Sequence, residues 1–144
     1  REVNLPAIAE GRKKADVAPE DFEIDYAPMI ATGQTEEEIE KSIAQVRDRI
    51  AFYGSTPGYR MVLELHGWGE LQSDLNRLMR EHRTSEMAEL IDDEILHTFA
   101  IVGEHEKIAP EFKRRYGDLI DRSAFLATGL SAENTHSVIS QLRL

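Results

Sequence analysis

The first residues whose types and spacing could do chemistry are two pairs with the pattern Glu-x-x-His. Glu94 and His97 form one pair, and Glu133 and His136 form the other. On a helix this spacing places both side chains on one face, as in carboxylate-bridged metal sites of helical bundles. Such a site also needs a glutamate from each of two further long helices, whereas the second pair directly follows a helix start at Ser131. We therefore expect no metal site and interpret both pairs as solvated helix faces.

A second candidate site lies in residues 53–69, where glycines and aromatic residues are concentrated. Ser55, Thr56 and Tyr59 offer hydroxyl donors beside aromatic surface, and the glycines permit close approach of the backbone. This combination is typical of the lining of a small-molecule pocket. The alternative is an ordinary helix–turn–helix junction with aromatic packing, and the spacing alone leaves both interpretations open.

Other catalytic signatures are missing from the sequence. The five histidines are scattered, and there is neither the Gly-x-Ser-x-Gly turn of a hydrolase nor a Gly-rich phosphate loop. The absence of cysteine excludes disulfides, thiolate nucleophiles and Cys-ligated metals. A basic triplet at residues 113–115 is expected to be a solvated face near the C-terminus of a helix, where positive charge is favoured.

Composition narrows the class of protein further. The chain has 144 residues, with 27 Asp and Glu against 17 Lys and Arg, and its formal net charge is -10. Such an acidic surface argues against nucleic acid or anionic lipid as a partner. No stretch approaches the roughly 20 apolar residues that span a membrane, and no signal-like run follows Arg1. We therefore expect a cytoplasmic protein without a membrane partner.

The elements expected before the aromatic segment are two helices and a strand between them. Apolar residues alternate with acids from Phe22 to Tyr26, which is the period of a strand. Thr35 and Glu38 form a capping box that begins the clearest helix. The expected elements are a helix over 2–15, a strand over 22–32 and a helix over 35–52.

The rest of the chain is expected to be mostly helical. Thr56 and Pro57 suit the start of a short helix that stops at Gly67. The apolar run 99–103 is too short to classify by its period. The further expected elements are a helix over 71–79, a helix from a cap at Thr84 or Ser85 to Leu96, a helix over 106–116 that is regular only after Pro110, a strand over 119–128 and a last helix capped by Ser131.

The two expected strands, separated by helices, predict a parallel crossover. Two strands alone do not make a stable sheet. The chain is therefore either a mainly helical domain, or its two strands complete a sheet that residues outside this sequence supply.

Several short sequence segments, taken together, resemble those of one protein family. The most specific are residues 50–59 (IAFYGSTPGY) and 62–69 (VLELHGWG). In this order they resemble the C-terminal part of the luciferase-like monooxygenase superfamily, specifically its branch of oxidoreductases that use the deazaflavin coenzyme F420. The resemblance runs from Leu5 to about Phe125. The weaker supporting words are Leu5-Pro6-Ala7, Glu10-Gly11, Ile91-Asp92-Asp93-Glu94, Val102-Gly103, Arg115-Tyr116-Gly117 and Asp121-Arg122.

The fold that this resemblance implies is α/β: residues 1–144 would be the C-terminal fragment of a single (β/α)8 TIM-barrel domain. Residues 22–32 would be the seventh strand and residues 119–128 the eighth. The helices over residues 70–98 would form an insertion between these strands, and the final helix would follow the eighth.

The resemblance also indicates where a site would lie, because barrel active sites are built at the C-terminal ends of the strands. This places residues 31–34, 53–59 and 128–130 nearest the pocket. Among them, we expect four residues to line a substrate pocket: Tyr53, Ser55, Thr56 and Tyr59.

The activity that the resemblance implies is hydride transfer between coenzyme F420 and a small organic substrate. Members that use flavin mononucleotide (FMN) instead perform oxygen-dependent monooxygenation. Most cofactor contacts in the family come from earlier strands, so no catalytic or cofactor-binding residue is assigned, and this part alone is expected to be inactive. The expected partners are the N-terminal remainder of the barrel, the substrate and further copies in a homo-oligomer. The alternative is a mainly helical binding or oligomerisation module without a cofactor.

Overall fold

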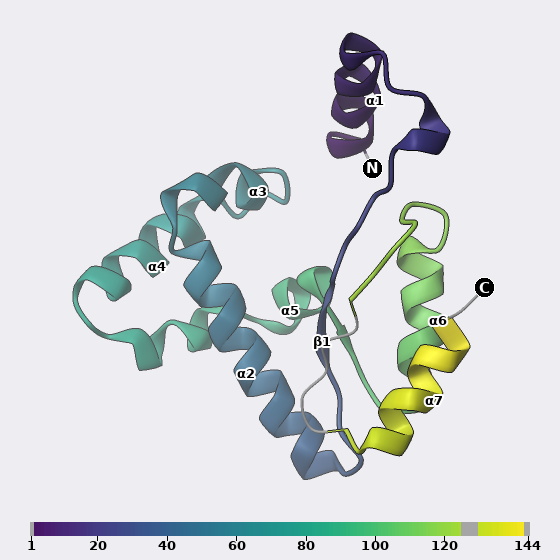
Figure 1. The fold of residues 1–144 in the computed structure, drawn as a ribbon. Coiled ribbons are helices and arrows are strands. Elements are labelled where there is room, and N and C mark those ends of the chain that lie inside the picture. The colour runs from purple at the N-terminus through teal and green to yellow at the C-terminus, as the bar shows by residue number, and fades with distance from the viewer. Residues whose placement is uncertain (1, 125–129, 143–144) are drawn as a thin grey trace.

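The computed structural model describes residues 2–124 and 130–142, which form helices around a short parallel pair of strands (Figure 1). None of the described helices combines the length and the apolar character that a membrane span requires. The α-helices and strands are α1 (Asn4–Ala15), β1 (Met29–Ala31), α2 (Glu36–Gly54), α3 (Arg60–Glu64), α4 (Gly69–Arg80), α5 (Asp93–Phe99), β2 (Ala100–Val102), α6 (His105–Tyr116) and α7 (Ala132–Leu142). Short 3-10 turns lie at Pro19–Asp21, Pro57–Tyr59, Thr84–Glu86 and Ala88–Leu90.

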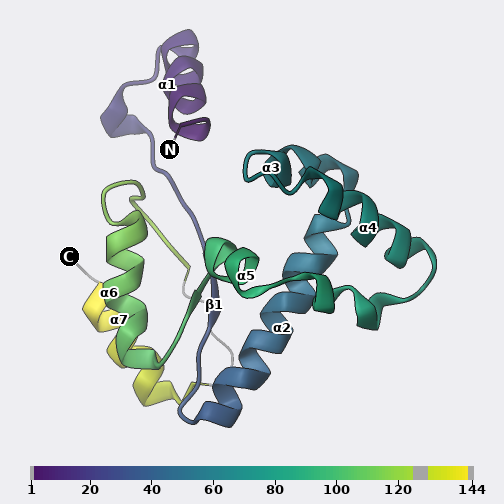
Figure 2. The same cartoon turned by 180° about the vertical axis from the view of Figure 1, so that it is seen from behind.

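The two strands are parallel, and the helices α2 to α5 make the crossover between them. Met29 pairs with Ala100 and Ala31 with Val102. In both views β1 runs between α2 on one side and the α6–α7 pair on the other (Figures 1 and 2). The described residues therefore form a mixed α/β unit whose small sheet is covered by helices, and they do not close a barrel by themselves.

Each side of the sheet has its own apolar core. Ala31 and Ala100 pack with the buried residues of α2, α4 and α5, among them Val46, Ile50 and Leu75. Ile30 and Ile101 point to the other side and pack with buried residues of α6 and α7 (Ile108, Ala109, Phe112 and Val138). The alternation of neighbouring strand residues between the two cores is the period-two geometry of an extended chain.

The predicted strand over 22–32 is shorter than expected. Only Met29–Ala31 is strand, and upstream an isolated bridge joins Asp25 to Arg122. Pro28 carries no N–H for a ladder, and the aromatic rings of Phe22 and Tyr26 remain exposed. The alternation of apolar and acidic residues over 22–26 is therefore not accompanied by the continuous strand pairing that it predicts.

The predicted second strand over 119–128 is wrong as far as the structure describes it. Arg122 makes the isolated bridge, and residues 125–128 lie outside the described residues. The strand that pairs with β1 is Ala100–Val102. It lies within the apolar run 99–103, which is too short to classify from its period. The expectation that residues 22–32 and 119–128 are consecutive strands is also wrong, because β2 lies between them in the chain.

The predicted capping box of α2 is confirmed with one difference. The Thr35 hydroxyl accepts the Glu38 N–H at 3.2 Å. The Glu38 carboxylate accepts the N–H of Gln34, at 2.7 Å, one residue before the expected partner. The side chains of Thr35 and Glu38 thus each accept a backbone N–H at the start of α2 and stabilise this end of the helix.

The helix predicted from Thr84 or Ser85 to Leu96 is broken in the structure. Two 3-10 turns precede α5, and the Asp92 carboxylate accepts the Ile95 N–H at 2.9 Å, which starts a new helix there. Pro110 lies well inside α6 rather than in its first turn, because the helix already begins at His105. The Ser131 cap is confirmed, since its hydroxyl accepts the Asn134 N–H at 3.1 Å.

Helix α1 stands apart from the other helices, beyond the start of β1 (Figures 1 and 2). None of its residues is buried. Its main side-chain contact to the following segment is the Arg12 guanidinium over the Phe22 ring, 5.8 Å from the ring centre. A helix with no buried residue lacks the tertiary packing that stabilises most helices in proteins.

Candidate functional site

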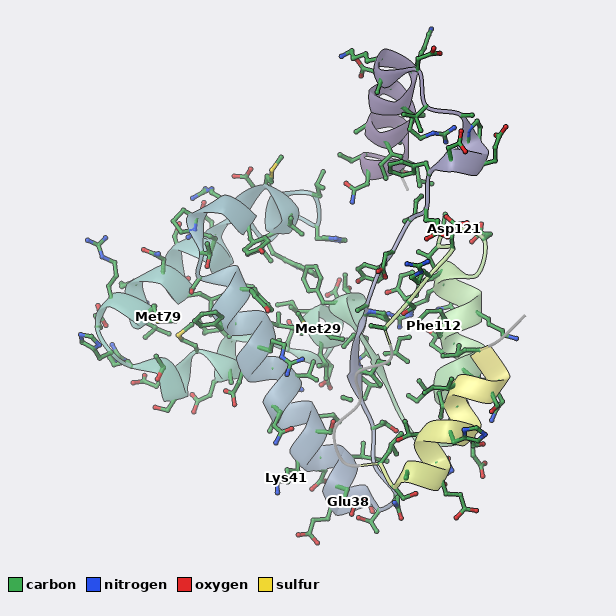
Figure 3. The ribbon with its side chains drawn as sticks, in the orientation of Figure 1. Met29, Glu38, Lys41, Met79, Phe112 and Asp121 are labelled. Carbon is green, nitrogen blue, oxygen red and sulfur yellow. The ribbon has the colours of Figure 1, made fainter. Side chains whose placement is uncertain are left out.

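The C-terminal end of β1 is held tightly against the start of α2. Thr32 is fully buried, and its N–H donates to the Ser42 hydroxyl at 3.2 Å. A Cβ added to Gly33 would lie 2.6 Å from the Cβ of Glu38, so only glycine permits this approach. The labels of Glu38 and Lys41 in Figure 3 mark this end of α2 beside the β1–α2 turn.

One polar atom in this packed turn has no partner. The Thr32 hydroxyl is buried and makes no hydrogen bond to any atom of the structure. Buried polar groups are nearly always paired, and an unpaired one costs about 1–3 kcal/mol. The hydroxyl is closed off by the chain itself, so in this arrangement it faces no ligand.

The C-terminal end of β2 lies directly beside that of β1. The Gly103 N–H donates to the Ala31 carbonyl at 3.0 Å, and Gly103 has a φ of 150°, which L side chains rarely adopt. Glu104 and His105 then lead into α6. The two strand ends therefore form one continuous edge, which is the position of the active site in barrel enzymes.

The charge at this edge is negative. The first turn of α2 carries Glu36, Glu37 and Glu38, and the start of α6 carries Glu104 and Glu106. A cofactor phosphate needs free N–H donors or cations at a helix N-terminus. At α2 the protein's own Thr35 and Glu38 side chains already accept backbone N–H groups. These N–H groups are therefore not free for the phosphate of F420 or FMN.

The four residues predicted to line a pocket lie at the other end of α2. This helix has 19 residues, so its ends are about 28 Å apart. Tyr53 and Tyr59 come together edge to face, with ring centres 5.8 Å apart, and both are about half exposed. Thr56 is exposed beside them.

Ser55 is the one of these four that is buried. Its hydroxyl donates to the Phe52 carbonyl at 2.7 Å. Its own carbonyl accepts from the amides of Gln72, at 3.1 Å, and Asn76, at 2.9 Å. Ser55 thus joins the end of α2 to α4, while the two tyrosines form surface. A substrate-lining role of the four residues stays a prediction.

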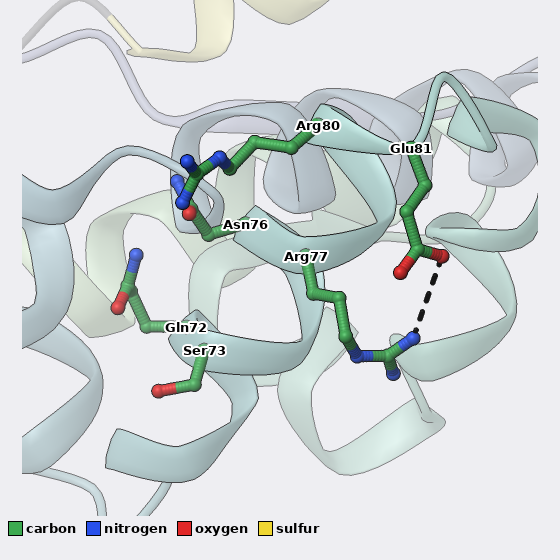
Figure 4. A pocket seen from close by; sticks show the side chains of 6 residues that line it. All are labelled: Gln72, Ser73, Asn76, Arg77, Arg80 and Glu81. Atoms are coloured by element: carbon green, nitrogen blue, oxygen red, sulfur yellow. Dashed lines mark ion pairs between the residues drawn. The ribbon is translucent and has the colours of Figure 1, made fainter.

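A pocket that the sequence did not indicate lies along α4 next to Ser55 (Figure 4). Its volume is about 430 Å³. Arg77 points toward Glu81, with which it forms an ion pair at 3.7 Å. The lining residues are Gln72, Ser73, Asn76, Arg77, Arg80 and Glu81. Polar residues four apart, such as Gln72 and Asn76, were the available signal. The pocket is polar, and no described aromatic residue lines it.

The His-Gly-Trp word forms an aromatic cluster at the start of β2. The His66 ring stacks on Trp68 with ring centres 5.1 Å apart, and both rings meet Phe99. Gly67 makes the turn between them with a φ of 81°. The cluster packs the α3–α4 junction against the start of β2. This packing gives the His-Gly-Trp segment a structural role.

The basic triplet is only partly the solvated face that was expected. Arg114 and Arg115 both hydrogen-bond to Glu111 and hold the pKa of that carboxyl at about 2, with Arg114 the stronger cause. Arg115 also donates to the carbonyls of His97, at 2.8 Å, and Ala100, at 3.0 Å. Arg115 therefore links α6 to the junction between α5 and β2 by hydrogen bonds.

The two Glu-x-x-His pairs do not meet. The His97 ring lies against the Asp93 carbonyl, with a distance of 2.7 Å. Within residues 2–124 and 130–142, no three His, Asp or Glu side chains form a group that could hold a metal ion.

Comparison with known proteins gives one consistent result. A family model described as luciferase-like monooxygenase matches residues 1–122. An uncharacterized protein of Mycobacterium bovis and uncharacterized proteins of two Mycobacterium tuberculosis strains are each 37% identical over 142 residues. These matches cover 99% of this chain and 42% of each relative. The chain therefore belongs to the luciferase-like monooxygenase family.

Proposed function

We propose that the chain is the C-terminal part of a (β/α)8 oxidoreductase that transfers a hydride between coenzyme F420 and a small organic substrate. The observation that carries the proposal is the family match over residues 1–122. The F420 branch rests on the resemblance of residues 50–59 and 62–69. The cofactor supplies the hydride chemistry, and the protein binds and orients it.

Three observations support a role as part of a larger barrel. The chain spans 42% of the length of the relatives it matches. Its described strands pair only with each other, and two strands do not make an independently stable sheet. No residue of helix α1 is buried. A remainder of the barrel that adds strands beside β1 and packs on α1 would satisfy all three.

This chain's contribution to such a site would be a wall of the barrel mouth. The edge formed by Thr32, Gly33 and Gly103 is rigid because the β1–α2 turn and the strand pairing hold it. It is also acidic, and two backbone N–H groups at the start of α2 are already held by side chains of the chain itself and are not free for a cofactor phosphate. No catalytic residue is assigned to this chain.

The second candidate is an FMN-dependent monooxygenase of the same family, since the matching family is that of luciferase-like monooxygenases. The experiment that decides is a titration of the complete protein carrying this chain with F420 and, separately, with FMN, followed by cofactor fluorescence. The proposal predicts saturable binding of F420 that is at least about tenfold tighter than that of FMN. Tighter binding of FMN would select the second candidate. Binding of neither cofactor would contradict both and favour a module without a cofactor.

A further inference from the structure

We draw no further inference here: the strongest candidate, the polar pocket along α4 next to Ser55, lies open on the surface of a chain that spans 42% of the length of its relatives, and nothing in the structure shows whether a ligand or the remainder of the same protein fills it.

Discussion

The two ends of helix α2 differ in almost every physical respect. At its start, Thr35 and Glu38 form a double cap, Gly33 is packed against the helix and Thr32 is fully buried. At its end, aromatic rings lie half exposed in a row. The start is rigid and belongs to the strand-end edge, while the end is an apolar surface.

This difference indicates that the two ends of α2 have separate roles, which the residue types alone did not distinguish. The family resemblance placed residues 31–34, 53–59 and 128–130 nearest one pocket, because barrel active sites lie at the C-terminal ends of the strands. In the structure a helix of about 28 Å lies between the first two of these segments. We assign the strand-end edge to the proposed barrel mouth, whereas the aromatic residues at the end of α2 form exposed surface.

The largest expected effect tests the rigidity of the strand end. Gly33→Ala places a Cβ 2.6 Å from the Glu38 Cβ and 2.8 Å from the Ile39 backbone nitrogen. We expect a loss of about 3 kcal/mol in the free energy of unfolding, measured by urea titration. Gly58→Ala is the control at the other end, because nothing lies within 4 Å of its Cβ position. Equal losses in the free energy of unfolding at Gly33 and Gly58 would contradict the proposed difference in packing between the two ends of α2.

A smaller loss is expected from Ser42→Ala. The Ser42 hydroxyl accepts the buried N–H of Thr32, and its removal leaves that donor unpaired. The free energy of unfolding should fall by about 2 kcal/mol. Ser73→Ala, on the exposed side of α4, serves as the comparison and should change it by less than about 0.5 kcal/mol. A neutral Ser42→Ala would mean that water satisfies the Thr32 N–H.

Thr32→Val should stabilise the protein. Valine has the shape of threonine and removes the buried hydroxyl that has no hydrogen-bond partner. A gain of about 1 kcal/mol in the free energy of unfolding is expected. The exposed Thr56, substituted in the same way, should give no gain. A loss in Thr32→Val would show that the hydroxyl does have a partner in the complete protein.

The smallest effect on stability is expected at the exposed end of α2. Phe52 is 57% exposed, so Phe52→Ser should change the free energy of unfolding, measured by urea titration, by less than about 0.5 kcal/mol. A large loss of stability would assign this ring to the core instead.

Local signals made much of the fold predictable from the sequence. The caps at Thr35 and Ser131 act over three or four residues, and the structure confirms both. The same locality explains the failure over residues 84–96, where the Asp92 cap competes with the apolar periodicity and starts a new helix. Strand β2 has three residues and pairs with a partner about 70 residues away, so no period in its own sequence could reveal it.

The candidate site was predictable from the sequence only in part. Tyr53, Thr56 and Tyr59 do lie on an aromatic surface, as their composition indicated. Their place at the C-terminal end of α2, away from the strand end, already follows from the predicted helix over 35–52, which separates residues 31–34 from residues 53–59. The use of Ser55 as a link to Gln72 and Asn76 depends on tertiary contacts between α2 and α4.

The most direct test of the account is to measure which end of α2 lies nearer the cofactor. A fluorescence acceptor would be attached at Gln34→Cys or at Phe52→Cys in the complete protein. This chain has no cysteine of its own, and any cysteine elsewhere in the protein would first be replaced by serine. Energy transfer from bound F420 would then be compared at the two positions. The account predicts stronger transfer to residue 34, at the strand-end edge. Stronger transfer to residue 52 would contradict this prediction and place the cofactor near the exposed C-terminal end of α2.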